Sequence, residues 1–160
     1  MHRRYTHTLI IWVIVLLLTA CGSTKVNTAQ SRFYQSFVTR FNVYHNGNEA
    51  YKEGLSAQEK SHKDNYMEII PLFPVSKENT RSSGSGSFDK AIEKSQKAIK
   101  LHSIKQKPKK KAGRKLSEKD KLWYAKKEYN PYLHNAWMLM GKAQFQKGEF
   151  LEAASTFSYI

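Results

Sequence analysis

The sequence predicts an all-α protein built from antiparallel helix pairs and preceded by an export signal. Three observations lead to this fold class. Apolar residues recur three and four positions apart over much of the chain, which is the spacing of a helical face. Glycine and proline fall between these periodic segments, where helices end. Residues 1–20 hold a short apolar run behind a basic start, which is typical of a signal peptide.

The N-terminal segment ends in Leu18-Thr19-Ala20-Cys21. Small residues before a cysteine are typical of a bacterial lipoprotein signal, and Cys21 is the only cysteine in the chain. We expect residues 1–20 to be removed and Cys21 to become the lipidated N-terminus, with palmitate among its acyl chains. A membrane-spanning helix is one alternative, but the apolar run Leu9–Ala20 has 12 residues, whereas a span needs about 20. A cleaved signal without lipid is the other.

The charge balance is strongly basic, at +14 for the whole chain and +12 without residues 1–20. Such a surplus favours anionic partners. The export signal argues against nucleic acid and favours an envelope surface or an acidic protein. The residues Gly22–Lys25 contain no acidic side chain, and this favours an outer-membrane anchor on the periplasmic face. With a single cysteine, neither an intrachain disulfide nor a cysteine metal cluster can form.

Composition divides the mature chain into four parts. Residues 21–31 are polar and form a lipidated tether. Residues 32–104 form an N-terminal helical region, in which about 69–87 is a flexible insertion rich in proline, serine and glycine. Residues 105–115 are a basic loop with seven lysines or arginines, interpreted either as a solvated connection or as a contact with lipid head groups or another anionic partner. Residues 116–160 hold one further helix and a helix pair.

Each expected helix has an apolar face. The first helix carries Phe33, Phe37, Val38, Phe41 and Tyr44, and a turn at Asn46-Gly47-Asn48 separates it from a helix over Glu49–Lys60. Two prolines predict an extended conformation for Ile69–Val75. The composition of Ser76–Ser87 predicts a loop. The remaining helices are expected at Phe88–Ile104, Leu116–Glu128, about Tyr132–Lys147, and from Phe150 to the end. Pro131 is placed in the first turn of the helix that follows Asn130.

The last thirty residues carry a specific pattern of aromatic and small residues, namely Trp137, Gly141, Ala143, Phe145, Gly148, Phe150, Ala153 and Phe157. This pattern resembles the tetratricopeptide repeat, a helix–turn–helix unit. Gly141 is expected to let the two helices approach, Gly148 to form their turn, and the aromatic residues to fill the space between helices. Phe88, Ala91, Ser95 and Ala98 resemble the second helix of an earlier repeat, with its first helix in Tyr44–Leu55.

The sequence stops at Ile160, inside the second helix of the clearest repeat. A solenoid without a terminal cap exposes an apolar face. We therefore expect the chain to be the first part of a longer repeat protein.

Three segments together resemble the PorW/SprE family of tetratricopeptide lipoproteins from Bacteroidota. They are Arg40–Ala50, Phe88–His102, and Asn130–Tyr132 with the following Leu139–Phe145, in addition to the Cys21 signal. Members of this family serve type IX protein secretion and, in gliding species, gliding motility. The resemblance implies an outer-membrane lipoprotein that links the translocon to the periplasmic ring, and it does not imply an enzyme.

The residues themselves show no catalytic constellation. The histidines after the signal, His45, His62, His102 and His134, lack the spacing of helical metal ligands. We expect no catalytic residue, metal, cofactor or small-molecule substrate. Tyr44, His45 and Asn46 are polar-tipped residues at the expected turn and are the candidate partner-binding residues. The alternative is that this segment only forms the turn.

The sequence is thus interpreted as a lipid-anchored, non-catalytic scaffold whose stacked helix pairs present a groove for a partner helix or peptide. Two alternatives keep the same anchor. One is a scaffold for outer-membrane barrel assembly, and the other is an accessory lipoprotein of a cell-wall enzyme.

Overall fold

The computed structural model describes residues 26–70, 72–73, 75, 78–110, 113 and 115–160. Every regular element in these ranges is helical, which confirms the all-α class. The elements are α2 (Ala29–Val38), η1 (Thr39–Tyr44), α3 (His45–Ser61), α4 (Glu78–Ser82), α5 (Ser85–His102), α6 (Glu118–Ala125), α7 (Leu133–Lys147) and α8 (Phe150–Tyr159). The predicted signal peptide and Cys21 lie outside the described residues. None of the described helices is long and apolar enough to cross a membrane.

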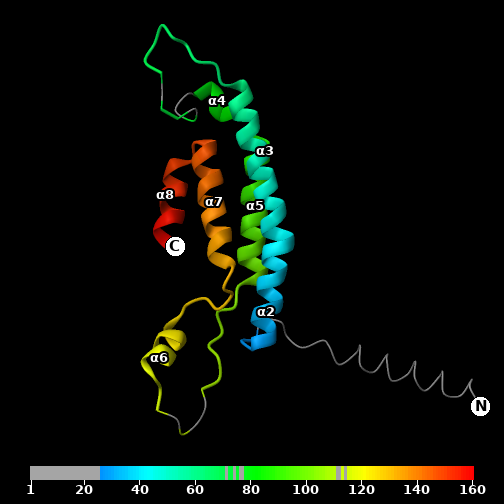
Figure 1. Cartoon of the computed structure of the whole chain (residues 1–160), viewed down its shortest axis with the longest axis vertical. Coiled ribbons are helices and arrows are strands. Elements are labelled where there is room, and N and C mark those ends of the chain that lie inside the picture. Colours follow the sequence, from blue (N-terminus) through cyan, green and yellow to red (C-terminus); the bar gives the residue numbers. More distant parts are fainter. Residues whose placement is uncertain (1–25, 71, 74, 76–77, 111–112, 114) are drawn as a thin grey trace, which may run out of the picture.

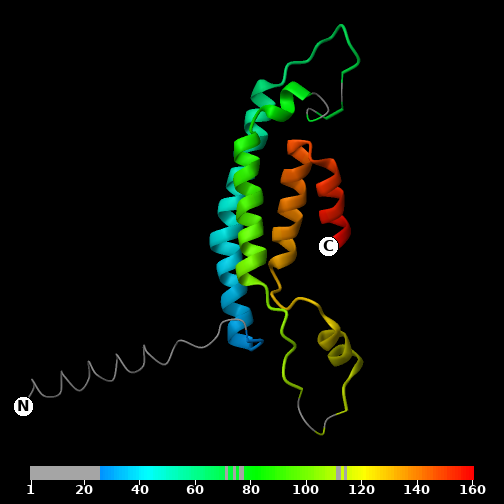
Figure 2. The same ribbon diagram turned by 180° about the vertical axis from the view of Figure 1, so that it is seen from behind.

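Long helices lie side by side and give the molecule its shape (Figure 1). α2, η1 and α3 follow one another as a single rod, and α5 packs between that rod and α7. α8 folds back onto α7. The short helices α4 and α6 lie near opposite ends of the molecule, as both views show (Figures 1 and 2).

The core runs along both sides of α5. One cluster joins Val43, Ala98, Leu133 and Ala136, and the other joins Ala50, Phe88, Ala91 and Ala143. Alanine supplies five of the eight buried residues in these two clusters, and its small side chain lets neighbouring helices approach closely. The apolar face expected on α5 is buried at Phe88, Ala91, Ser95 and Ala98, whereas Leu101 near its end is 46% exposed.

Each helix pair contains a glycine that lies against a phenylalanine ring. A Cβ atom at Gly54 of α3 would lie 2.6 Å from the Phe88 ring of α5. A Cβ atom at Gly141 of α7 would lie 2.6 Å from the Phe157 ring of α8. Both distances are shorter than van der Waals contact, so a larger residue would push the two helices apart. The expected role of Gly141 in close helix packing agrees with this geometry.

The predicted turn at Asn46-Gly47-Asn48 is wrong. These residues lie in the first turns of α3, which continues directly from η1. Gly47 is buried, and a Cβ atom there would lie 3.2 Å from both Leu139 and Lys94. Packing against α5 and α7 therefore overrides the local turn preference of the Asn-Gly sequence.

The segment expected to be a loop, Ser76–Ser87, is partly helical. It contains α4, and α5 already begins at Ser85. Arg81 of α4 donates from Nε to the Val75 carbonyl at 2.7 Å and lies over the Phe150 ring at 5.2 Å. These contacts hold α4 on the junction of α7 and α8, and local composition does not reveal them. In Ile69–Val75, none of the described residues is α-helical, as expected.

The connection from α7 to α8 has the predicted form. Gly148 adopts φ of +90°, and its N–H bonds to the Phe145 carbonyl at 3.0 Å. Next to it, Lys147 bridges Asp89 at 2.7 Å and Glu149 at 2.6 Å. The hydrogen bond to Asp89, followed by that to Glu149, raises the pKa of Lys147. The turn is thereby tied to the first part of α5.

Two predicted helix boundaries differ from the structure. α7 begins at Leu133, and Pro131 lies in a turn before it rather than in its first turn. There the Asn130 side chain accepts a hydrogen bond from the Tyr132 N–H at 3.0 Å. α6 ends at Ala125, three residues before the expected end at Glu128. The chain leaves the helix because Glu128 is used to bind backbone N–H groups, as described below.

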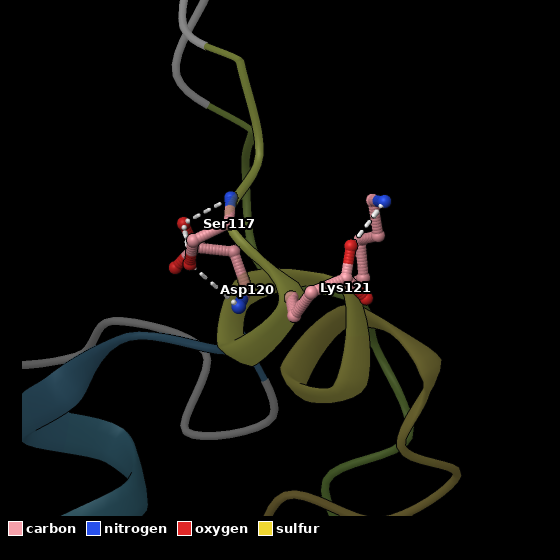
Figure 3. Close-up of polar contacts among 4 residues, drawn as sticks. Ser117, Asp120 and Lys121 are labelled. Carbon is pink, nitrogen blue, oxygen red and sulfur yellow. Dashed lines mark hydrogen bonds and ion pairs between the residues drawn. The ribbon is translucent and has the colours of Figure 1, made fainter.

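α6 begins with a capping box (Figure 3). The Ser117 hydroxyl accepts from the Asp120 N–H at 3.2 Å, and the Asp120 carboxylate accepts from the Ser117 N–H at 3.1 Å. Lys121 pairs with Glu118 at 2.6 Å on the exposed surface. The reciprocal bonds satisfy N–H groups that lack partners inside the helix.

Replacing Ser117 with alanine is expected to destabilise α6 by about 1 kcal/mol, because it removes the cap acceptor. Amide hydrogen exchange of the first turn of α6 measures this effect. Glu118→Gln is the matched control, and it should cost less than about 0.5 kcal/mol because its ion pair is exposed. Equal exchange rates in the two variants would contradict the prediction.

Candidate protein-interaction surface

An exposed row of phenylalanines runs along α2 and η1. Phe33, Phe37 and Phe41 are 73%, 52% and 56% exposed. The rings of Phe33 and Phe37 lie 6.2 Å apart, and those of Phe37 and Phe41 lie 4.8 Å apart. We call these three residues the aromatic row. The apolar face expected on the first helix does not face the core at these three positions, because Gln35, Thr39 and Val43 occupy the inward face of the same rod.

The Arg40 side chain links the aromatic row to Tyr132, directly before α7. The Arg40 guanidinium lies 4.9 Å from the centre of the Phe41 ring and 5.7 Å from that of Tyr132. The Tyr132 ring meets Tyr44 edge-on at 5.3 Å. Burial, followed by the nearby Tyr132, raises the pKa of Tyr44. Tyr44 is therefore partly a packing residue that joins η1 to the start of α7.

The three candidate partner-binding residues occupy different environments. Tyr44 is half-buried, whereas His45 and Asn46 are exposed. The Asn46 amide donates to the Asn42 side chain at 3.3 Å on the helix surface. Since these residues lie on a continuous helix, His45 and Asn46 present a flat polar surface and not a protruding turn.

A network of polar side chains joins the C-terminal end of α5 to the segment that precedes α7. The Glu128 carboxylate accepts from the backbone N–H groups of Ile104, Tyr129 and Asn130 at 2.8, 3.0 and 2.8 Å, and from the Ser103 hydroxyl at 2.5 Å. The Asn130 amide donates to Thr39 at 3.0 Å and to the His102 carbonyl at 2.9 Å. These bonds connect η1, α5 and the segment before α7, so they position the aromatic row against Tyr132.

His102 belongs to the same network. Its Nδ1 lies 2.6 Å from the Gln35 side-chain oxygen. Burial, followed by the nearby Lys97, lowers the pKa of His102. The folded state therefore favours the neutral imidazole more than the unfolded state does.

This linkage predicts a loss of stability in mild acid. Because the pKa of His102 is lowered in the folded state, its neutral form contributes fully to stability above the ordinary histidine pKa near 6.5. This contribution to the free energy of unfolding is lost as the pH falls below that value. Urea unfolding at pH 7.5, 6.5 and 5.5 measures the change. His102→Gln should flatten this part of the profile, whereas His45→Gln, at an exposed site, should retain it. A His102→Gln profile that coincides with that of the parent would contradict the assignment.

A groove of about 410 Å³ opens between the ends of α5, α7 and α8. Its apolar floor comes from Ile99, Leu133, Trp137, Tyr159 and Ile160, and its rim carries Lys105, Lys127, His134 and Glu128. The Trp137 and Tyr159 rings pack at 4.4 Å. An apolar floor with a mainly basic rim suits a segment that is apolar on one face and acidic at its edges.

The aromatic residues of the expected repeat are less buried than predicted. Ala143 and Ala153 are buried, but Phe145, Phe150 and Phe157 remain 38%, 40% and 39% exposed. Phe145 and Phe150 contact each other edge-on at 5.4 Å across the turn. These rings keep one side accessible because α8 packs mainly on α7 among the described elements.

Within the described ranges, no three histidine, cysteine, aspartate or glutamate side chains are grouped as metal ligands would be. His62 lies 3.0 Å from Asp64 and 3.3 Å from Thr80, at the α4 end. His45, His102 and His134 belong to other parts of the fold.

No protein-family model matches the chain, and no curated protein matches it either.

Residue spacing indicates neither that the aromatic row is exposed nor that Glu128 and Asn130 form hydrogen bonds between separate segments. The absence of any acidic residue before Glu49 was a signal that the first helix differs from the others. Nothing comparable marks Glu128, because its partners are three backbone N–H groups and the Ser103 hydroxyl, from two separate segments.

Proposed function

We propose that this protein is a lipid-anchored, non-catalytic scaffold of the tetratricopeptide type that holds protein partners at the outer membrane. The observation that carries the proposal is the stack α3–α5–α7–α8, in which each helix packs on the next. Stacking of antiparallel helix pairs is the architecture of helical repeat proteins, and such proteins bind partners along extended surfaces.

Two details support the repeat assignment. Both helix pairs use a glycine under a phenylalanine ring, Gly54 under Phe88 and Gly141 under Phe157. Both second helices bury an alanine at the matching position of the pattern, Ala91 and Ala153. The two ring contacts lie at different heights, since Phe88 is in the first turn of α5 and Phe157 in the last part of α8. Both pairs therefore use the same glycine–phenylalanine contact, but at different positions along the second helix.

The groove between α5, α7 and α8 is the proposed binding surface for a partner helix or peptide. Its apolar floor provides the area to be buried, and Lys105, Lys127 and His134 favour an acidic rim on the partner. His45 and Asn46, together with the aromatic row, form a separate surface on the opposite helix of the bundle.

The cellular role is proposed from the N-terminal signal and the family resemblance. Cys21 would carry the lipid and hold the helices on the periplasmic face of the outer membrane. The PorW/SprE-like segments Arg40–Ala50 and Phe88–His102 suggest type IX secretion and gliding motility, with the protein linking translocon and periplasmic ring.

Anchoring is tested by labelling cells with a palmitate analogue and separating their membranes. The parent chain should carry the label and fractionate with the outer membrane. Cys21→Ser should lose the label and leave that fraction. Label on the Cys21→Ser variant, or an unlabelled parent chain, would overturn the lipoprotein assignment.

Partner identity is tested by pull-down from detergent-solubilised outer membranes, with mass spectrometry of the bound proteins. The proposal expects components of the type IX translocon or its periplasmic ring. A charge-reversed groove variant, Lys127→Glu with His134→Glu, should recover less of them. Recovery of barrel-assembly proteins or cell-wall enzymes without any secretion component would replace the proposed role with the corresponding alternative.

A further inference from the structure

We propose that the end of the molecule carrying α2, α6 and the described part of the basic loop, residues 105–110, lies directly on a bilayer containing anionic phospholipid. This membrane-facing end would be a second membrane contact beside the lipid on Cys21. The inference depends on the proposed function only for the identity of that membrane, since charge and exposure of the surface argue for the lipid contact by themselves.

Positive charge is concentrated in one stretch of the chain. Residues 105–127 contain eleven lysines or arginines and two acidic residues. Among the described residues of this stretch, every lysine is exposed, including Lys107, Lys109 and Lys110 of the basic loop and Lys126 after α6. The acidic pair Glu118 and Asp120 is engaged by Lys121 and by the Ser117 cap. The basic side chains therefore present a surface that attracts phosphate groups.

The aromatic row adds apolar surface to this charge. Phe33, Phe37 and Phe41 are each more than half exposed, and Tyr34 beside them is 54% exposed. The sequence has no acidic residue before Glu49, while Lys25, Arg32 and Arg40 are basic. A helix with exposed aromatic rings, basic neighbours and no carboxylates has the composition of helices that lie in the membrane interface.

The two surfaces meet at one end of the fold. The Asn27 side chain donates to the Gln106 carbonyl at 2.7 Å, which brings the start of α2 onto the basic loop. The Arg32 guanidinium lies 5.2 Å from the centre of the Trp123 ring. Phe33, Trp123 and Lys126 line the same groove of about 210 Å³. Figures 1 and 2 show α2 and α6 at this end, far from α4.

An anionic bilayer explains this combination better than an acidic protein does. A lipid interface accepts aromatic rings at the acyl boundary and lysines at the phosphates, and it covers a broad, irregular end without a matching shape. An acidic protein would match the charge but would need a complementary surface for three separate elements. The exposed aromatic row therefore favours lipid.

Trp123 provides a local probe for this contact. The full chain, purified from membranes in detergent, is reconstituted into vesicles of phosphatidylcholine with or without about one third phosphatidylglycerol. Vesicles of each composition contain brominated lipid, which quenches tryptophan on contact. Trp12 lies in the segment expected to be removed, so Trp137→Phe leaves Trp123 as the single tryptophan of the mature chain. Trp123→Phe leaves Trp137, which lies in α7, as the matched control. Circular dichroism verifies that both variants are folded.

We expect brominated lipid to quench Trp123 several-fold more in anionic than in neutral vesicles, and to leave Trp137 unquenched in both. The substitutions Lys107→Glu, Lys109→Glu and Lys110→Glu, all at exposed loop positions, should abolish the difference. Equal quenching of Trp123 in the two compositions, or absence of quenching in both, would overturn the inference. Flotation of the vesicles measures membrane binding separately. If the protein floats with both vesicle types but Trp123 is quenched only weakly, the lipid anchor on Cys21 is supported and the proposed contact of this end with lipid is rejected. If an added acidic protein shields Trp123 from a soluble quencher and anionic vesicles do not, the surface binds a protein partner and the proposal is wrong.

Discussion

Gly54→Val is expected to lower the free energy of unfolding by about 3 kcal/mol, at the upper end of the usual cost of overpacking. The first atom added at this position already lies 2.6 Å from the Phe88 ring. Phe88 is fully buried and belongs to the core cluster between α3, α5 and α7. The ring has no space to move, so α3 and α5 must separate. Urea unfolding followed by circular dichroism measures the effect.

Gly86→Val is the matched control for this prediction. Gly86 lies in the first turn of α5, and a Cβ atom there has no neighbour within 4 Å. Its substitution should change stability by less than about 0.5 kcal/mol, as is usual at surface positions. Equal destabilisation by the two substitutions would show that the glycine–ring contact does not determine how α3 packs on α5.

Glu128→Ala is expected to lower the free energy of unfolding by about 3 kcal/mol, because it removes the acceptor of three backbone N–H groups and one hydroxyl. Ile104, Tyr129 and Asn130, which supply the N–H groups, are all buried. The Tyr129 N–H retains a second acceptor, the Ile104 carbonyl at 3.0 Å, so the loss falls mainly on the N–H groups of Ile104 and Asn130. Urea unfolding also measures this loss.

Glu128→Gln separates the hydrogen bonds from the charge. The amide retains one oxygen, which can still accept from the backbone donors, so we expect a cost of about 1 kcal/mol. A Gln variant as unstable as the Ala variant would show that the negative charge, and not the acceptor, holds the segment before α7. A stable Ala variant would contradict the role of Glu128 altogether.

Helical periodicity predicted most of the described fold because the inward faces are continuous. The buried face of α5, from Phe88 to Ala98, was recognised from residue spacing alone, and α7 and α8 lie within one residue of their expected positions. The Gly148 turn was also predictable, since a left-handed backbone at the end of a helix strongly favours glycine.

The errors occurred where contacts distant in sequence outweighed local preference. Asn46-Gly47 forms part of a helix because Gly47 packs against α5 and α7. The spacing of Phe33, Phe37 and Phe41 predicts a common helix face, but it does not show whether that face points to the core or to solvent. The polar side chains of Gln35 and Thr39, which face inward, are satisfied by His102 and Asn130 from later in the chain, and periodicity does not encode such pairings.

The candidate site was predicted less completely than the fold. His45 and Asn46 are accessible as expected, whereas Tyr44 packs against Tyr132. The groove beside Trp137 depends on Ile99 and Tyr159 from the neighbouring helices. No pattern within one helix can show that these residues converge, because the convergence follows from how the pairs stack.

Site-specific crosslinking in living cells tests the scaffold proposal most directly. A photoreactive amino acid is placed at His134, which is exposed at the groove, and in a control strain at Lys60, which is exposed near the end of α3. The proposal predicts a covalent adduct with a type IX translocon or periplasmic ring protein from position 134 and none from position 60. Adducts from position 134 with barrel-assembly or cell-wall proteins alone, or the same adducts from both positions, would contradict it.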